Sequence, residues 1–160
     1  MALVTKKRLV RLAKGFFPAL CRPDDAWALA RLAPDEAELY RAMDVRDREH
    51  NVAVAKLLLE RWPDAPDPVV RAALVHDAGK SVRPYNVWER IFTALFERWA
   101  PEVAPYPLLG GLSGAWQVRR HHPRYAADRI ADPEVARMVR EHHEGTTLWI
   151  TRLRAVDGDF

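Results

Sequence analysis

The chain has 160 residues, 49% of them hydrophobic, and this length and composition suit one globular domain with a single core. Its 25 basic and 22 acidic residues give a formal net charge of +3, which argues against a dedicated nucleic-acid-binding protein with a strongly basic face. The single cysteine, Cys21, rules out an intramolecular disulfide, and no apolar run approaches the roughly 20 residues of a membrane-spanning helix. We therefore expect a cytoplasmic protein with no membrane partner.

The residue pattern favours an all-α fold. Ala, Leu, Arg and Glu are abundant, whereas the runs of alternating apolar and polar residues that are typical of strands are hard to find. We expect residues 1–45 to form N-terminal helices packed on a core formed by residues 46–160.

The N-terminal part predicts three helices. Residues 4–20 form a basic amphipathic pattern, which we interpret as a terminal helix docked on the domain. Pro23 and Pro34, each followed by acidic residues, predict the starts of short helices over residues 23–33 and 34–44.

The next predicted helix covers residues 46–62 and places His50 at the start of its apolar face. The following apolar residues lie at positions i+3, i+4, i+7 and i+8 from this histidine: Ala53, Val54, Leu57 and Leu58. His50 therefore continues the buried face of the helix and does not lie on its solvent side.

A further helix is predicted from Asp67 as N-cap and Pro68 as the first helical residue to Gly79 as its stop. Its apolar residues lead directly to a His-Asp pair: Val69, Val70, Ala73 and Leu74. Adjacent side chains on a helix point about 100° apart, so His76 can bind one ion while Asp77 reaches the same ion or bridges to a second.

The C-terminal half begins with a Pro- and Gly-rich segment, residues 98–116, which predicts a loop or a broken helix. Asp132 and Pro133 then repeat the helix-start signal, and helical spacing follows in Val135, Met138, Val139, His142 and His143. A last helical face ends in an aspartate: Trp149, Ile150, Leu153, Val156 and Asp157.

Several predicted helices thus begin or end their apolar face with a histidine or an aspartate. A single histidine in such a place is commonly a hydrogen-bonded core residue. Burying several of these groups without a cation would cost roughly 1–3 kcal/mol for each unpaired polar group, and more for an ionised aspartate. A shared metal removes this cost, and nitrogen and carboxylate ligands without thiolate suit a divalent transition metal, one or two ions of Fe, Mn, Co, Ni or Zn.

The order of these residues resembles that of the HD-domain phosphohydrolase superfamily, all-helical metal-dependent enzymes named for a His-Asp pair. The resemblance covers residues 46–157 and rests on this order: His50, His76-Asp77, His122-Pro123, His142-His143 and Asp157, with Lys80 three residues after Asp77. It implies a single-domain, HD-domain-like helical bundle with an HD-type metal-dependent phosphohydrolase core over residues 46–160. Residues 1–45 and 98–116 lie outside the resemblance.

The resemblance also implies the ligands of two metal ions. Four residues would hold the first ion, and they suffice in family members that bind one: His50, His76, Asp77 and Asp157. Four residues would hold the second ion, with Asp77 bridging the two: Asp77, His122, His142 and His143. The sequence leaves open which of His142 and His143 is the direct ligand. His121 has no clear family counterpart, so we expect it to be hydrogen-bonded or exposed.

The implied reaction is hydrolysis of a phosphomonoester or phosphodiester, with a nucleotide or similar small molecule as substrate. Asp77 and Lys80 are the candidate catalytic residues, and Lys80 is placed to pair with a phosphoryl oxygen. Guanidinium groups also match phosphate oxygens, and four arginines near the predicted ligands are candidates for this role: Arg46, Arg119, Arg120 and Arg124. Salt bridges or surface solvation would explain any one of these arginines equally well.

Two other functions remain open. A dinuclear iron centre of related fold can activate dioxygen, as in the inositol-cleaving oxygenases, and a non-catalytic module could keep the fold to sense nucleotides. Several aromatic residues could stack on a base, although packing in the core or in a homodimer explains them more simply: Trp88, Trp99, Tyr106 and Trp116.

Overall fold

The computed structural model describes residues 17–83 and 86–160, and this part of the chain contains eight α-helices and no β-strand. The prediction of an all-α fold is therefore confirmed. Most of the predicted helix over residues 4–20 lies outside the described residues, which include only its last turn, the 3-10 helix η1 (Pro18–Leu20). None of the described helices combines the length and the apolar composition that crossing a membrane requires.

The first two α-helices, α2 (Asp25–Leu29) and α3 (Pro34–Ala42), pack on the same apolar core as the rest of the chain. The helix predicted over residues 23–33 is shorter at both ends. Its start is set by Asp24, whose side chain accepts a hydrogen bond from the backbone N of Trp27 over 3.2 Å. The second helix begins at its predicted proline.

The centre of the domain is formed by α4 (Val45–Arg61) and α5 (Asp67–Val75). Their buried apolar residues belong to one cluster: Val52, Val54, Ala55, Leu58, Val69, Val70, Ala73 and Leu74. The buried Asn51 Nδ2 donates to the backbone carbonyl of Leu74 over 3.1 Å. Because Asn51 directly follows His50, this bond holds the predicted ligand of α4 close to the end of α5.

The end of α5 differs from its prediction. The α-helix stops at Val75 with His76 as its C-cap, and after Asp77 the chain continues as the short 3-10 helix η2 (Ala78–Val82). Gly79 therefore does not end the helix but lies within η2, where it permits a close backbone contact. A β-carbon at this position would lie 2.7 Å from the carbonyl carbon of His122, a distance that real side chains do not reach.

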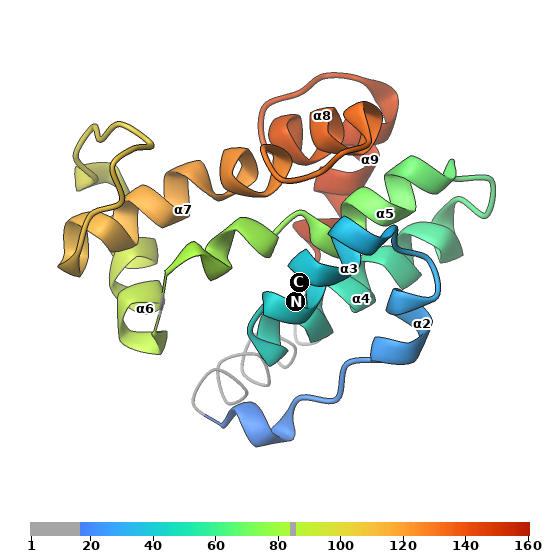
Figure 1. Ribbon diagram of the computed structural model, residues 1–160, viewed down its shortest axis with the longest axis horizontal. Helices are drawn as coiled ribbons and strands as arrows, with labels where there is room; N and C mark the ends of the chain where they lie inside the picture. Colours follow the sequence, from blue (N-terminus) through green and yellow to red (C-terminus); the bar gives the residue numbers. More distant parts are fainter. Residues whose placement is uncertain (1–16, 84–85) are drawn as a thin grey trace.

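A helix that the sequence did not predict, α6 (Val87–Leu95), is followed by the 3-10 helix η3 (Glu97–Trp99). Its start is defined by a reciprocal cap, in which the Asn86 side chain accepts from the backbone N of Glu89 (2.9 Å) and the Glu89 carboxylate accepts from the backbone N of Asn86 (3.0 Å). Figure 1 shows α6 beside the N-terminal half of α7 (Gly111–Ala127), at the end of the molecule away from α5.

The loop predicted over residues 98–116 is shorter than expected, because α7 begins at Gly111. Gly111 has a φ of +56°, a left-handed conformation that glycine adopts without steric cost, and it turns the chain into the helix. Gly114 lies inside the helix. The carbonyl group of Leu109 packs against it, and a β-carbon at this position would collide with that group. These glycines, which predict a loop in the sequence, therefore serve the start and the packing of a helix.

The last two helices are α8 (Pro133–Glu141) and α9 (Leu148–Asp157). Asp132 caps α8 as predicted, since its side chain accepts hydrogen bonds from two backbone amides of the first turn. Asp67 instead forms the first residue of α5. The buried residues of both helices complete the core against α4 and α5: Val135, Met138, Val139, Ile150, Leu153 and Val156.

Candidate metal centre

The structure brings together the seven side chains that the sequence selects as metal ligands. They come from α4, the ends of α5, α8 and α9, and the middle of α7: His50, His76, Asp77, His122, His142, His143 and Asp157. Neighbouring imidazole rings join them into one cluster, with centroid separations of 5.7 Å for His50–His76, 5.1 Å for His76–His142 and 5.6 Å for His122–His142.

The first part of this cluster, group one, contains His50, His76 and Asp77, whose ligand atoms all lie within 4.8 Å of one another. Asp157 joins it from α9, because its Oδ1 lies 2.7 Å from Nε2 of His50 and 3.7 Å from Nε2 of His76. Both ring nitrogens that face Asp157 are Nε2 atoms. The four residues that the family resemblance implies for a first ion are therefore neighbours.

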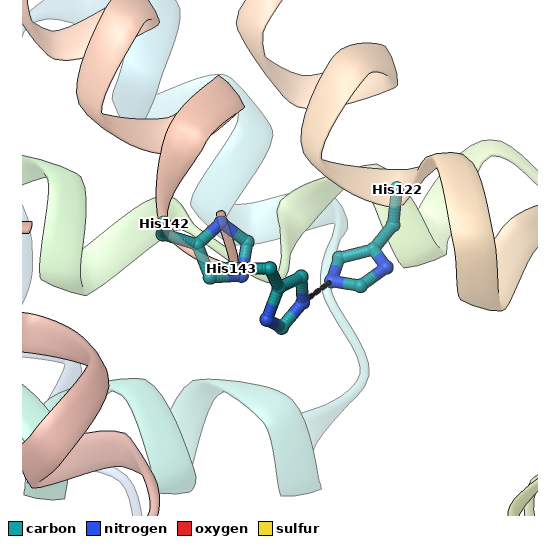
Figure 2. Close-up of side chains that lie close together, drawn as sticks. All are labelled: His122, His142 and His143. Atoms are coloured by element: carbon teal, nitrogen blue, oxygen red, sulfur yellow. Dashed lines mark hydrogen bonds between the residues drawn. The ribbon is translucent and has the colours of Figure 1, made fainter. Parts of the chain in front are cut away.

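The second part, group two, contains His122, His142 and His143, whose ligand atoms also lie within 4.8 Å of one another. Figure 2 shows the three rings turned toward one another, with His122 coming from α7 and the other two from the end of α8. Nε2 of His143 lies 3.4 Å from Nε2 of His122. His142 is buried and His143 is exposed, so the two adjacent histidines approach the group from different depths.

Asp77 of group one lies between the histidines of the two groups. Its Oδ2 is 3.9 Å from Nε2 of His76 in group one, and its Oδ1 is 3.4 Å from Nε2 of His122 in group two. The ammonium group of Lys80 lies 2.6 Å from the same Oδ1. Each oxygen of this one carboxylate thus faces a different set of imidazoles.

Three buried histidines share one ring orientation. Nδ1 of each ring bonds the backbone carbonyl three residues earlier: His76 to Ala73 (2.9 Å), His122 to Arg119 (2.8 Å) and His142 to Val139 (2.7 Å). A carbonyl oxygen only accepts, so Nδ1 carries the proton and Nε2 of the neutral ring keeps its lone pair. Nε2 of His76 and Nε2 of His142 are buried and have no hydrogen-bond partner among the described residues. These are the atoms that a histidine ligand offers to a metal.

The accepting carbonyls are ones that the helices leave without an intrahelical donor. Ala73 and Val139 lie in the last turns of α5 and α8, where the final four carbonyls of a helix lack an amide partner. His122 lies inside α7, but it is followed by Pro123, which has no N–H to offer the carbonyl of Arg119. Each ring therefore completes the backbone hydrogen bonding and is oriented by it.

Burial lowers the pKa of all three histidines in group two. For His142 the pKa falls well below its usual value, because the neighbouring rings of His76 and His143 further oppose a positive charge. Burial and the nearby His122 lower the pKa of His143 to about 4. Burial also lowers the pKa of His122, and the opposing effect of Asp77 offsets this only in part. The three rings are therefore neutral at pH 7, the form in which imidazole binds a metal.

The carboxylates are ionised for a different reason. Burial alone would raise the pKa of Asp77, but the charges of Lys80 and His76 hold it well below its usual range. Burial would likewise raise the pKa of Asp157, but the hydrogen bond from His50 and the nearby ring of His76 lower it instead. Burial lowers the pKa of His76, yet the two carboxylates outweigh it and raise that pKa above the usual value. A divalent cation would satisfy both carboxylates at once.

We compared the chain with models of protein families, with curated proteins and with solved structures, and none of these matches it. What the site can bind therefore follows from its own side chains. They offer imidazole nitrogen and carboxylate oxygen, which suit Fe, Mn, Co, Ni or Zn. Buried Nε2 atoms without a partner, neutral rings and ionised carboxylates all fit one or two such ions.

The four predicted phosphate-binding arginines each have a carboxylate partner. The nitrogen–oxygen distances are 2.7 Å for Arg46–Asp44, 2.9 Å for Arg119–Glu97, 3.8 Å for Arg120–Glu102 and 3.5 Å for Arg124–Asp128. Salt bridges, the alternative that the sequence left open, thus account for these side chains as they stand. Lys80 differs from them, because its partner Asp77 belongs to the cluster itself.

His121 does not belong to either group. Its Nε2 donates to the backbone carbonyl of Val103 over 2.8 Å, so the expectation that it is hydrogen-bonded is confirmed. Two further side chains of α7 hold the same loop: Tyr125 donates to the carbonyl of Pro105 and Gln117 to that of Pro107. Of the two adjacent histidines in α7, His121 therefore binds the loop and His122 belongs to the cluster.

One ion pair beside the cluster was not found from the sequence. Arg90 of α6 donates two hydrogen bonds to the buried carboxylate of Asp47, each over 2.7 Å. Asp47 lies one helical turn before His50, and the charge of Asp77 also contributes to a raised pKa of Arg90. The only available signal was the position of Asp47 on the face of α4 that carries His50, because its partner is 43 residues away.

Proposed function

We propose that this chain is a metal-dependent phosphohydrolase of the HD-domain superfamily, which hydrolyses a phosphate ester of a nucleotide or similar small molecule. The observation that carries the proposal is the position of Asp77, whose two oxygens face two separate groups of histidines at 3.9 and 3.4 Å. A carboxylate in this position can bridge two cations. Pairs of ions are a common means of hydrolysing phosphate esters, and the family resemblance associates this ligand order with that reaction.

The ligands divide between two ions as follows. Group one with Asp157 would hold the first: His50, His76, Asp77 and Asp157. Group two with the bridging carboxylate would hold the second: Asp77, His122, His142 and His143. When bound, such ions lower the pKa of a coordinated water and neutralise charge on the phosphoryl oxygens. The backbone bonds from the ring Nδ1 atoms keep the ligand nitrogens turned toward the ions, so the centre is oriented before they bind.

Lys80 supplies positive charge beside the bridging carboxylate. Its ammonium lies 2.6 Å from Oδ1 of Asp77, and its side chain keeps 20% of its surface exposed, so a ligand from solvent can reach it. In the proposed reaction this ammonium pairs with a phosphoryl oxygen while it continues to hold the carboxylate ionised. Arg90 adds a second positive charge that the ion pair with Asp47 keeps in place.

The proposal is tested by metal analysis of the purified protein, followed by turnover assays. Phosphomonoesters, nucleotides and cyclic dinucleotides are each assayed with Mn²⁺, Co²⁺, Ni²⁺, Zn²⁺ and Fe²⁺. We expect two ions per chain and phosphate release with at least one of them. Asp77→Asn should reduce that turnover more than about a hundredfold, because losing even the residues that orient a metal ligand costs 10–100-fold.

The matched control is Asp64→Asn, which changes an exposed carboxylate in the turn between α4 and α5 and should leave turnover unchanged. Two outcomes would contradict the proposal. Nucleotide binding in calorimetry without hydrolysis under any of the ions would indicate a sensing module. Dioxygen consumption that requires iron, without phosphate release under the other ions, would indicate an oxygenase.

A further inference from the structure

The apolar face of α6 points away from the core. Four apolar residues follow helical spacing along it, and a fifth comes from η3: Trp88, Phe92, Leu95, Phe96 and Trp99. On the opposite face, Arg90 bonds Asp47 and Thr93 is fully buried. A surface helix ordinarily buries its apolar side, whereas here Trp88 and Leu95 are 68% and 70% exposed. Arg90 thus holds the polar side of the helix, while Phe92 on the apolar side packs against Trp116 of α7.

Exposed apolar side chains gather on α6, on η3 and on the first turn of α7, and we call them the aromatic face: Trp88, Leu95, Phe96, Trp99 and Leu112. Rings beneath and within it are in contact, with centroid distances of 4.7 Å for Phe92–Phe96, 5.4 Å for Phe96–Trp99 and 5.3 Å for Phe92–Trp116. Leu112 lies one helical turn before Trp116 in α7 and so extends the face onto that helix. Figure 1 places α6 at the end of the molecule, beside the first half of α7.

The exposed apolar area of the aromatic face is comparable to that of a homodimer interface. With about 150–250 Å² for each fully exposed aromatic side chain and somewhat less for leucine, the fractional exposures leave roughly 500 Å² of apolar surface. The largest apolar patch of a typical monomer covers about 300–600 Å² and is often functional. A standard interface buries about 800 Å² per partner, of which about 65% is apolar in homodimers, and this requires about 500 Å².

The charges near the aromatic face have both signs. Glu97 pairs with Arg119 over 2.9 Å, and Glu102 lies 3.8 Å from Arg120. The guanidinium carbon of Arg98 lies over the ring of Trp99, 3.8 Å from its centroid. Nucleic acid or an anionic membrane would favour a surface of one positive sign. A surface that carries both signs at its border can instead pair with a rotated copy of itself.

We propose that the aromatic face is the contact surface of a homodimer, in which α6 of one copy packs against α6 of a second copy about a twofold axis. The surface is apolar at its centre, rich in Trp and Phe, and bordered by charges of both signs, which is the composition of a protein interface. The inference goes beyond the proposed function and does not depend on it, because no metal ligand lies on the aromatic face.

The test is sedimentation velocity of the whole chain over a concentration series from about 1 to 200 µM, a range that covers the affinity of a modest interface. We expect a concentration-dependent dimer. Leu95→Glu and Trp99→Glu, made separately, should each weaken it by at least about tenfold, because they bury an unpaired charge. Leu148→Glu, at a leucine that is 60% exposed at the start of α9, is the matched control and should leave the dimer unchanged.

Circular dichroism of every variant checks that the helices are retained, and the exposed position of Leu95 makes that outcome expected. A wild-type chain that stays monomeric at every concentration would overturn the proposal. So would a dimer that Leu95→Glu and Trp99→Glu leave intact, because the contact would then lie on another surface.

Discussion

Gly79 and His122 touch through their backbones. A β-carbon at Gly79 would overlap the carbonyl group of His122, so only glycine lets η2 lie this close to α7. The contact has a direct consequence for the candidate metal centre. Asp77 comes two residues before Gly79, and its Oδ1 lies 3.4 Å from Nε2 of His122. Because residue 79 is glycine, η2 can bring the Asp77 carboxylate close to His122 of group two.

Gly79→Ala should therefore separate η2 from α7. We expect a loss of about 1–3 kcal/mol in the free energy of unfolding, because a methyl group is forced against backbone that cannot easily move. We also expect weaker binding of the second ion, measured by calorimetric titration of the metal-free protein. Gly110→Ala is the control, since no atom lies within 4 Å of its added carbon. Equal stability and metal affinity in the two variants would show that the backbone contact is unimportant.

Asp77 and Asp157 should differ in how many ions they hold. Only Asp77 lies between the two groups, whereas Asp157 contacts His50 and His76 alone. After dialysis at a metal concentration that loads two ions on the wild type, we expect Asp157→Asn to keep one ion and Asp77→Asn to keep none. Elemental analysis gives the count. Retention of the same number of ions by both variants would remove the bridging role from Asp77.

Pro123 should matter for metal binding although it contacts no ion. An alanine at this position would restore an N–H to the carbonyl of Arg119 and compete with Nδ1 of His122 for it. We expect the affinity for the second ion to fall about tenfold, as is typical when the group that orients a ligand is lost. The thermal midpoint of the metal-free protein should rise, because proline within a helix costs about 3 kcal/mol. Pro133→Ala, at the first position of α8, should leave metal affinity unchanged.

The sequence predicts well what depends on local spacing. Helical periodicity predicts that His50, His142 and Asp157 continue apolar helix faces, and Pro34 and Pro133 mark the starts of α3 and α8, because these signals act within one or two turns. That several of these residues share a metal was inferred from their places on the apolar faces, and the family resemblance then assigned them to two ions. The orientation of the rings has a local signal too, although it is visible only afterwards: a histidine before proline or at the end of a helix faces a carbonyl without a donor.

Tertiary contacts decide the features that the sequence did not predict. In the sequence, Gly79 predicts a helix stop and Gly114 a loop, because a glycine that admits a neighbouring backbone is indistinguishable from one that ends a helix. The helix α6 is different, because its signals are local: the Asn86–Glu89 cap marks its start and its apolar residues follow helical spacing. By contrast, nothing near Arg90 in the sequence indicates a partner 43 residues earlier.

The metal-free protein should lose stability as the pH falls from about 6.5 toward 4. The histidines of group two have a lowered pKa in the folded state, with His143 at about 4, so the unfolded chain binds more protons in this interval. The raised pKa of His76 acts above 6.5, since its contribution is complete below the unfolded value and is lost as the pH rises. The lowered pKa values of Asp77 and Asp157 act below about pH 5, where the unfolded carboxyl groups begin to bind protons. The contribution of the three histidines therefore falls mainly between about pH 6.5 and 5.

Urea unfolding of the chelator-treated protein at pH 6.5, 5.5 and 4.5 measures this slope. Each histidine that stays neutral in the folded state contributes about 1.4 kcal/mol for each pH unit over which its unfolded form is charged. His142→Gln should reduce the slope, because the deeply buried His142 has a pKa well below its usual value. His121→Gln, which changes a ring outside the cluster, should keep the wild-type slope. A stability that does not change across this window would mean that the rings of group two accept protons in the folded protein, and it would remove the electrostatic argument for a preformed metal centre.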